Sequence, residues 1–144
     1  MAKFPGVGEV GMTARGTSIQ AVEIVYNDAA GTYTIPVQAG SLVLRGGVVV
    51  ITAFDGTGAA LKTGDGTDDD GFIDNTDIDL TTAATGATPA VKLFSASSNP
   101  YAAGKYYAAD DTLDFVFAPG TTATTGRLIA FVEFVNVKLF GLSA

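Results

Sequence analysis

The stretch "RLIAFVEFVNVKLF", Arg127 to Phe140, is the longest and most apolar run in the chain. It has no consistent polar face, which is typical of a strand that is covered on both sides. A helix is the competing interpretation, but the Val, Ile and Phe content and the preceding Gly126 favour a strand. We therefore expect a strand at the centre of a sheet or at an oligomer interface, with four candidate interface residues: Ile129, Phe131, Phe134 and Val135.

The chain before this run also reads as strands. "IQAVEIVYN" (19–27) alternates, and "GTYTIPV" (31–37) is rich in β-branched and aromatic residues. Pro36 has no N–H to donate, so we expect that strand to end there or to lie at a sheet edge. Gly46 and Gly47 interrupt the next apolar run and suggest a turn or bulge. Further strands are expected in "SLVL" (41–44), "VVVITAF" (48–54), "AALKTG" (59–64), "AVKLFSAS" (90–97), "KYYAA" (105–109) and "TLDFVFA" (112–118), with a weak one in "DIDLTT" (77–82).

This pattern of about eight short strands, without a convincing helix, predicts an all-β fold. We expect a single-domain antiparallel β-sandwich, jelly-roll-like, over residues 19–144. Residues 1–18 are rich in glycine and read as an extended N-terminal arm. Lys3 and Arg15 against Glu9 give the arm a charge of +1, so the rest of the −7 chain carries −8. The arm is either a frayed terminus or a segment that orders on a neighbouring subunit.

Composition excludes several kinds of chemistry. The chain has no cysteine and no histidine, so thiol chemistry, Ser-His-Asp catalysis and imidazole metal sites are all absent. Its eight basic residues are scattered, which argues against nucleic acid as a partner. The first residues do not resemble a secretory signal, and no apolar stretch is long enough for a membrane helix, so we expect no membrane partner.

The acidic stretch "TGDGTDDDGFID", Thr63 to Asp74, is the best candidate for chemistry. It does not fit an EF-hand loop, because alignment on Gly71 puts Gly66 at the first ligand position and Asp77 at the last. A looser calcium site remains open, and its ligands would be Asp65, Asp68, Asp70 and Asp74. The alternative is a polar hairpin loop in which aspartates accept hydrogen bonds from nearby backbone amides.

Catalysis by paired carboxylates is the third interpretation. Glycoside hydrolysis needs two carboxyl groups about 5–10 Å apart, one of them in an apolar pocket. A solvated run of aspartates offers no such pocket, and the chain has no Trp to bind a sugar. Asp110 and Asp111 are expected to form a turn. We therefore predict that the protein is not an enzyme and has no resident cofactor, and calcium in the acidic stretch is the alternative left open.

One block of sequence resembles a known group of proteins. An apolar strand enters "TAFDGTG", followed by "GDGTDDDGF", "AADDTLDF" and a Thr/Gly turn into the last apolar strand, which together cover roughly residues 33–135. This pattern resembles the small capsid decoration, or cement, proteins encoded among the head genes of tailed bacteriophages. The resemblance implies a β-sandwich that forms homotrimers on the outer capsid surface of the virion and has the major capsid protein as its partner.

The arm would then contact the shell through Lys3, Phe4 and Arg15, because it is the basic part of an otherwise acidic chain. A phage fibre or receptor-binding module that recognises a host glycan or surface protein is the alternative. Its motivation is the three tyrosines beside acidic turns, for which a place in the core or in an interface is the competing interpretation: Tyr101, Tyr106 and Tyr107.

Overall fold

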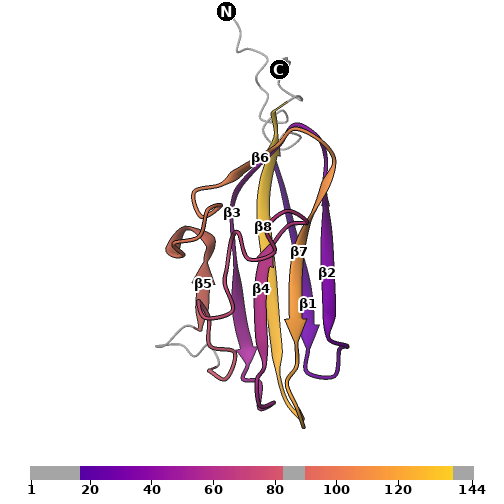
Figure 1. The fold of residues 1–144 in the computed structure, drawn as a ribbon, viewed down its shortest axis with the longest axis vertical. Helices are drawn as coiled ribbons and strands as arrows, with labels where there is room; N and C mark the ends of the chain where they lie inside the picture. Colours follow the sequence, from indigo (N-terminus) through magenta and orange to yellow (C-terminus); the bar gives the residue numbers. More distant parts are fainter. Residues whose placement is uncertain (1–16, 83–89, 138–144) are drawn as a thin grey trace, which may run out of the picture.

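The computed structural model describes residues 17–82 and 90–137. They form eight β-strands in two sheets (Figure 1), and a short 3-10 helix, η2 (Phe94–Ala96), follows the fifth strand. The strands are β1 (Thr17–Val25), β2 (Gly31–Val37), β3 (Ser41–Thr52), β4 (Ala60–Gly64), β5 (Val91–Leu93), β6 (Lys105–Tyr107), β7 (Asp111–Ala118) and β8 (Arg127–Asn136). The predicted all-β class is confirmed.

The two sheets have the strand order of a rolled-up hairpin. Sheet A has the order β1-β8-β3-β5, with β6 also paired to β3, and sheet B has the order β2-β7-β4. Every pair is antiparallel, and the first strand pairs with the last, the second with the seventh and the third with the sixth. Nested pairing of this kind is the topology of a jelly roll, so the predicted β-sandwich is confirmed.

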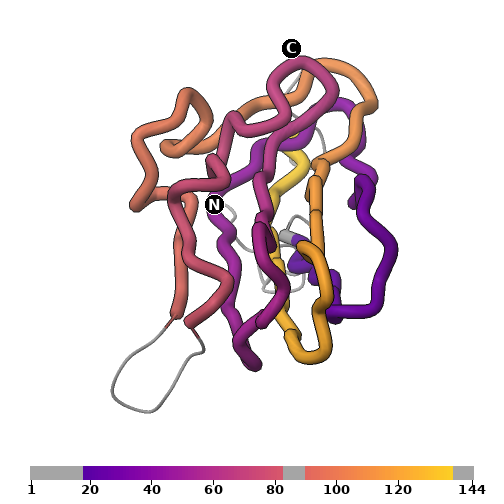
Figure 2. The backbone as a smooth tube through the Cα atoms, turned by 60° about the horizontal axis from the view of Figure 1, so that its bottom comes forward, coloured from indigo at the N-terminus to yellow at the C-terminus, as the bar shows by residue number. Residues whose placement is uncertain are grey.

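The far edge of sheet A is a broken strand. β5 pairs with Gly47–Val49 of β3, and β6 pairs with Ser41–Val43 of the same strand. Between them, residues 94–104 leave the sheet and form what we call the side loop, which projects from one flank of the sandwich (Figure 2). This interruption lets the side loop reach the segment that follows β4.

The apolar run that begins at Arg127 forms a central strand, β8, as predicted. β8 lies between β1 and β3, and its side chains alternate between two environments. Leu128, Ala130, Val132 and Phe134 point into the core and are at most 8% exposed. The prediction placed Phe134 with Ile129, Phe131 and Val135 at one interface. This is wrong for Phe134, because the two-residue period of a strand puts it on the opposite face.

The core lies between the inner faces of the two sheets. Sheet B contributes Leu113, Phe115 and Phe117 from β7, and sheet A contributes the buried side chains of β3 and β8. Phe54 meets Phe117 edge to face, with ring centroids 5.5 Å apart. Each fully buried side chain of this size contributes roughly 1.5–3 kcal/mol of transfer free energy, which makes this aromatic core the main source of stability.

Several details differ from the sequence-based expectations. β3 runs through Gly46 and Gly47 without a turn, and the irregularity predicted near them is a register shift between Val43 and Arg45. Gly46 is needed for close packing instead, because a Cβ there would lie 2.5 Å from the ring of Phe94. Residues 77–82, expected to be a weak strand, fold as turns. Pro36 does lie in an edge strand, β2, as predicted.

The predicted boundary between arm and body shifts by two residues. Thr17 and Ser18, assigned to the arm, pair with Val135 and Phe134 and belong to β1. The rest of the arm, with Lys3, Phe4 and Arg15, lies outside the described residues. Within the described ranges, no helix is long and apolar enough to cross a membrane.

Candidate functional site

The acidic loop, residues 65–79, connects β4 toward β5 and contains seven of the twelve aspartates of the chain. It begins where β4 ends at Gly64, and it runs alongside the side loop of sheet A. It carries the four predicted calcium ligands, so its geometry decides whether the loop is a site for an ion or a structural connection.

Asp65 points into the protein, although it belongs to the most acidic stretch of the chain. It is 1% exposed, and its Oδ1 accepts hydrogen bonds from the backbone N–H groups of Thr67 (2.9 Å) and Asp68 (3.1 Å). Its Oδ2 accepts a hydrogen bond from the Tyr107 hydroxyl (3.0 Å) and forms an ion pair with Lys105 Nζ. We call Asp65, Lys105 and Tyr107 the Asp65 cluster.

The Asp65 cluster joins the two sheets. Asp65 follows β4 of sheet B, whereas Lys105 and Tyr107 belong to β6 of sheet A. Burial alone would raise the pKa of Asp65, but the hydrogen bonds from Lys105, the two amides and Tyr107 outweigh it and hold that pKa below its usual value. Lys105 Nζ also lies 3.8 Å from the ring centroid of Tyr101, a cation–π contact.

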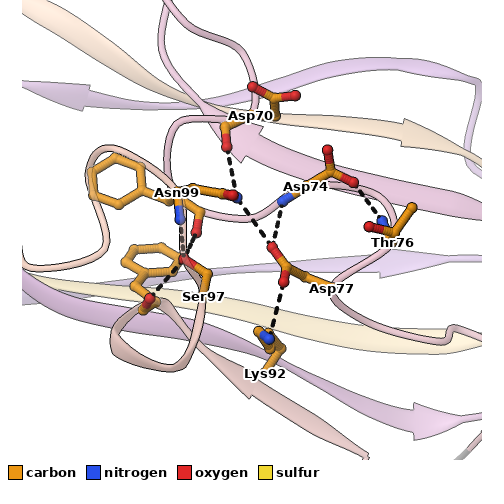
Figure 3. Close-up of polar contacts among 9 residues, drawn as sticks. Asp70, Asp74, Thr76, Asp77, Lys92, Ser97 and Asn99 are labelled. Atoms are coloured by element: carbon orange, nitrogen blue, oxygen red, sulfur yellow. Dashed lines mark hydrogen bonds and ion pairs between the residues drawn. The ribbon is translucent and has the colours of Figure 1, made fainter.

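A second cluster, formed by Asp77, Lys92 and Asn99, ties the far end of the acidic loop to sheet A (Figure 3). Asp77 Oδ1 lies 3.0 Å from Lys92 Nζ of β5, and its Oδ2 accepts hydrogen bonds from Asn99 Nδ2 (3.1 Å) and the Asp74 amide (2.9 Å). Burial raises the pKa of Asp77, but these hydrogen bonds and the lysine outweigh burial and lower it. We call this the Asp77 cluster.

Aromatic packing fills the space between the two clusters. Phe72 of the acidic loop stacks on Phe94, with ring centroids 4.6 Å apart, and meets Tyr101 edge to face at 5.2 Å. The Tyr101 amide donates to the Gly71 carbonyl (2.7 Å), and the Ser97 hydroxyl donates to the Phe72 carbonyl (2.7 Å). The acidic loop and the side loop therefore form one packed unit with a small apolar centre.

The remaining aspartates of the loop face outward. Asp69 forms an ion pair of 2.7 Å with Lys62, and Asp68 lies beside Asp70, which raises the pKa of Asp70 through their side-chain hydrogen bond. Asp68 and Asp69 border an open hollow of about 420 Å³ that also touches the outer face of sheet B. The hollow is lined by Thr32, Asp65, Gly66, Thr67, Asp68, Asp69, Asp114 and Val116.

The structure does not bring the four predicted calcium ligands together. Asp65 is held by Lys105 and Tyr107, and Asp74 accepts a hydrogen bond from the Thr76 amide (2.7 Å) while its own amide donates to Asp77. Within residues 17–82 and 90–137, no three acidic side chains are grouped as a metal site requires. The geometry matches the alternative, a loop whose aspartates accept from backbone amides, and calcium binding stays a prediction.

The tyrosines that motivated a glycan-binding module do not form a common platform. Tyr107 is 3% exposed, and Tyr101 packs against Phe72 and Lys105. Tyr106 is 44% exposed, but it lies in β6 between two residues whose side chains serve the Asp65 cluster. Two of the three therefore have structural roles, as the competing interpretation predicted.

Two other motifs of the decoration-protein pattern, "TAFDGTG" and "AADDTLDF", also have aspartates that stabilise loops between strands. Asp55 of "TAFDGTG" accepts hydrogen bonds from the side chain and amide of Thr124 and from the amide of Thr125, which lower its pKa to about 2. Asp110 of "AADDTLDF" accepts a hydrogen bond from the Ala39 amide (2.8 Å). These aspartates hold loops that are far apart in sequence, which explains their place in the pattern without catalysis.

The outer face of sheet A is the second candidate site, and it is apolar. Cross-strand neighbours form two rows over four strands, one through Phe131 and one through Ile129. Its charged residues pair with each other: Arg45 with Glu133 (2.9 Å) and Arg127 with Glu23. The first row is Ala21, Phe131, Gly47 and Leu93, and the second is Glu23, Ile129, Val49 and Val91.

Sequence reasoning found the outer residues of β8 but missed the cationic partners of the acidic loop. Lys92 and Lys105 are single lysines in short apolar or aromatic strands, "VKL" and "KYY". A lone lysine in such a strand is the available signal, because a buried amine needs a carboxylate partner. The identity of that carboxylate, 40 residues from Lys105, could not be read from spacing.

The sequence matches no protein-family model and no curated protein. Its fold, however, is similar to chains of two solved structures. One is the acid-stable capsid of Helicobacter pylori bacteriophage KHP30, with a TM-score of 0.58 and 11% identity over 83% of this chain and 87% of that one. The other is the capsid asymmetric unit of cyanophage Pam1, with a TM-score of 0.57 and 12% identity over 83% of this chain and 84% of that one.

Proposed function

We propose that the chain is a structural virion protein that binds the outside of a tailed-phage capsid as a homo-oligomer and stabilises the shell. The observation that carries this proposal is the fold: 83% of the chain superposes on chains from two phage capsid structures, and most of each of those chains is covered. The sequence pattern over residues 33–135, which resembles phage decoration proteins, points the same way.

The arrangement of surfaces supports a binding role. The described residues form a two-sheet body with loops held by buried ion pairs, and one outer face of that body is apolar. An apolar face of this kind is typical of a surface that another protein covers. The aspartates singled out by sequence are engaged with amides, lysines or each other, which supports a structural role over a catalytic one.

A protein of this kind would act by mass action. If each copy binds the assembled shell and not its separated subunits, it stabilises the shell by RT ln(1 + [L]/Kd), about 2.7 kcal/mol at a concentration 100 times Kd. Oligomers that touch several shell subunits at once would gain avidity on top of this. The N-terminal arm, with Lys3, Phe4 and Arg15, is the proposed shell contact.

The test is binding of the purified protein to shells that lack it, measured by co-sedimentation and by the temperature at which the shells release their genome. We expect binding and a higher release temperature. A matched pair of proteins, the full chain and a chain that begins at Thr17, tests the arm, because the truncation leaves β1 intact. Equal binding by the two proteins would refute the role of the arm. Failure of the full chain to bind would refute the shell-binding role.

A further inference from the structure

We propose that the outer face of sheet A is the contact between copies of this chain in the oligomer. This inference deepens the proposed function by naming the surface of self-association. It assigns Phe131, Ile129 and Val135 to that contact, excludes Phe134, and leaves the outer face of sheet B and the acidic loop free.

The first argument is where apolar surface is exposed. Six large apolar side chains of the described residues are 39% exposed or more, and all six belong to strands of sheet A: Ile19 (69%), Leu93 (45%), Tyr106 (44%), Leu44 (42%), Ile51 (39%) and Val91 (39%). Large contiguous apolar patches are rare on monomeric soluble proteins. Sheet B has no counterpart among the described residues, because its outward positions are threonines, charged residues, proline and small residues, and its outward Val116 is half-buried.

The electrostatics of the face favour a second copy of the chain as its occupant. The chain carries a charge of −7, so two copies repel each other wherever their aspartates meet. The described strands of sheet A contain no aspartate, and their outward acids, Glu23 and Glu133, are paired with Arg127 and Arg45. The face is therefore close to neutral, and it is the surface on which two acidic copies can approach without like-charge contact.

The outer face of sheet A covers an area similar to that of a small protein interface. The ten residues of β8 span about 33 Å at about 3.3 Å per residue, and four strands about 4.8 Å apart cover about 19 Å. The face therefore measures roughly 600 Å² in projection. Stable protein interfaces bury about 600–1,000 Å² per partner, so this face reaches the lower end of the range for two copies that stay together.

The centre of the face has the shape of an anchor site. Phe131 stands on the central strand, and its cross-strand neighbours are Ala21 on one side and Gly47 on the other. Phe131 is half-buried, and both of its direct neighbours in the row are small. Aromatic residues at the centre of an interface often dominate its binding free energy.

The test compares two charge insertions, each at an outward position of a strand that is paired on both sides. Phe131→Glu lies on β8 of sheet A, and Val116→Glu lies on β7 of sheet B. Particle mass is measured by light scattering over a dilution series, with circular dichroism to check folding. We expect wild type and Val116→Glu to form the same oligomer, and Phe131→Glu to raise the dissociation constant at least about 30-fold.

A second measurement does not depend on a destabilising variant. The chain has no cysteine, so Ile129→Cys and its sheet B counterpart Thr34→Cys each provide a single labelling site. Pyrene on residue 129 should give excimer emission between copies, and pyrene on residue 34 should not. Wild type that stays monomeric at every concentration, or excimer emission from residue 34 alone, would overturn the inference.

Shell binding separates this inference from the proposed function. If Phe131→Glu dissociates the oligomer but the wild-type oligomer does not bind a shell, the inference is supported and the proposed function is refuted. Monomeric wild type that binds shells, together with loss of shell binding in Phe131→Glu, would refute the inference and show that the face receives a shell protein.

Discussion

The outer face of sheet A and the acidic loop are opposite in character. The acidic loop holds seven of the twelve aspartates, and the described strands of sheet A hold none. The loop is nevertheless the part with buried charge, because Asp65 and Asp77 are tied to Lys105 and Lys92. In the strands of sheet A, by contrast, six large apolar side chains are exposed to solvent. The difference teaches that composition alone does not tell which segment is free to bind a partner.

The largest test of this comparison uses two isoleucines of β1. Ile24 is 0% exposed and faces the core, whereas Ile19 is 69% exposed and faces out. We expect Ile24→Ala to lower the free energy of unfolding by about 2–5 kcal/mol through lost burial and a cavity. Ile19→Ala should change it by less than about 0.5 kcal/mol. Urea unfolding at a concentration where the chain is monomeric measures both, and similar losses would contradict the assigned faces.

Replacement of Asp65, the carboxylate that points into the protein, is expected to have the next largest effect. Asp65→Asn keeps the shape of the side chain but leaves Lys105 without its charge partner, so we expect a loss of about 3 kcal/mol. The matched control is Asp69→Asn, whose partner Lys62 is more exposed, and this change should cost at most about 1 kcal/mol. Thermal or urea unfolding measures both losses. A larger loss of stability in Asp69→Asn than in Asp65→Asn would contradict the structural role assigned to Asp65.

The pH dependence of stability follows from the same carboxylates. The folded pKa values of Asp65 and Asp77 lie below the ordinary 3.8, so both groups stabilise the folded state above that pH. Their contribution is lost as pH falls through the folded values. Asp70 has a raised pKa and acts in the opposite direction. We expect wild type to lose stability below about pH 4, and Asp65→Asn to lose less over that range, measured by urea unfolding at a series of pH values.

A smaller effect is expected at the Asp77 cluster. Lys92→Met removes an ion pair whose side chains are 20% and 16% exposed, and we expect a loss of about 1 kcal/mol. Lys62→Met is the control, since the side chains of its pair are 32% and 53% exposed, and it should cost less. Hydrogen exchange of the Tyr101 amide, which donates to Gly71, should rise in Lys92→Met and stay unchanged in the control.

The smallest expected effect concerns calcium. Asp65 and Asp74 are engaged elsewhere, so we expect neither excess chelator nor added calcium to change the melting temperature. Tight binding to the folded state would raise stability by about 2.7 kcal/mol at 100 times Kd, which a melting curve detects easily. A clear rise with calcium, lost in Asp68→Asn, would instead show that the acidic loop binds the ion.

The sequence by itself determined the strands and most of their faces. Alternation in residues 19–27 and the apolar run at 127–136 depend on local side-chain patterns, and β1 and β8 followed them closely. Pro36 marked an edge strand because its ring removes a backbone donor. Strand period also distinguishes Phe134 from Phe131, and that error came from grouping residues by hydrophobicity alone.

Tertiary structure decided what the aspartates do and which apolar face stays uncovered. Nothing local pairs Asp65 with Lys105 or Asp77 with Lys92, because these contacts exist only when β5 and β6 form the broken edge of sheet A beside the acidic loop. Likewise, Ile19, Phe131 and Leu93 become one surface only when β1, β8, β3 and β5 align. Backbone preferences act over a few neighbouring residues, whereas charge partners and surfaces are set by pairing across the whole chain.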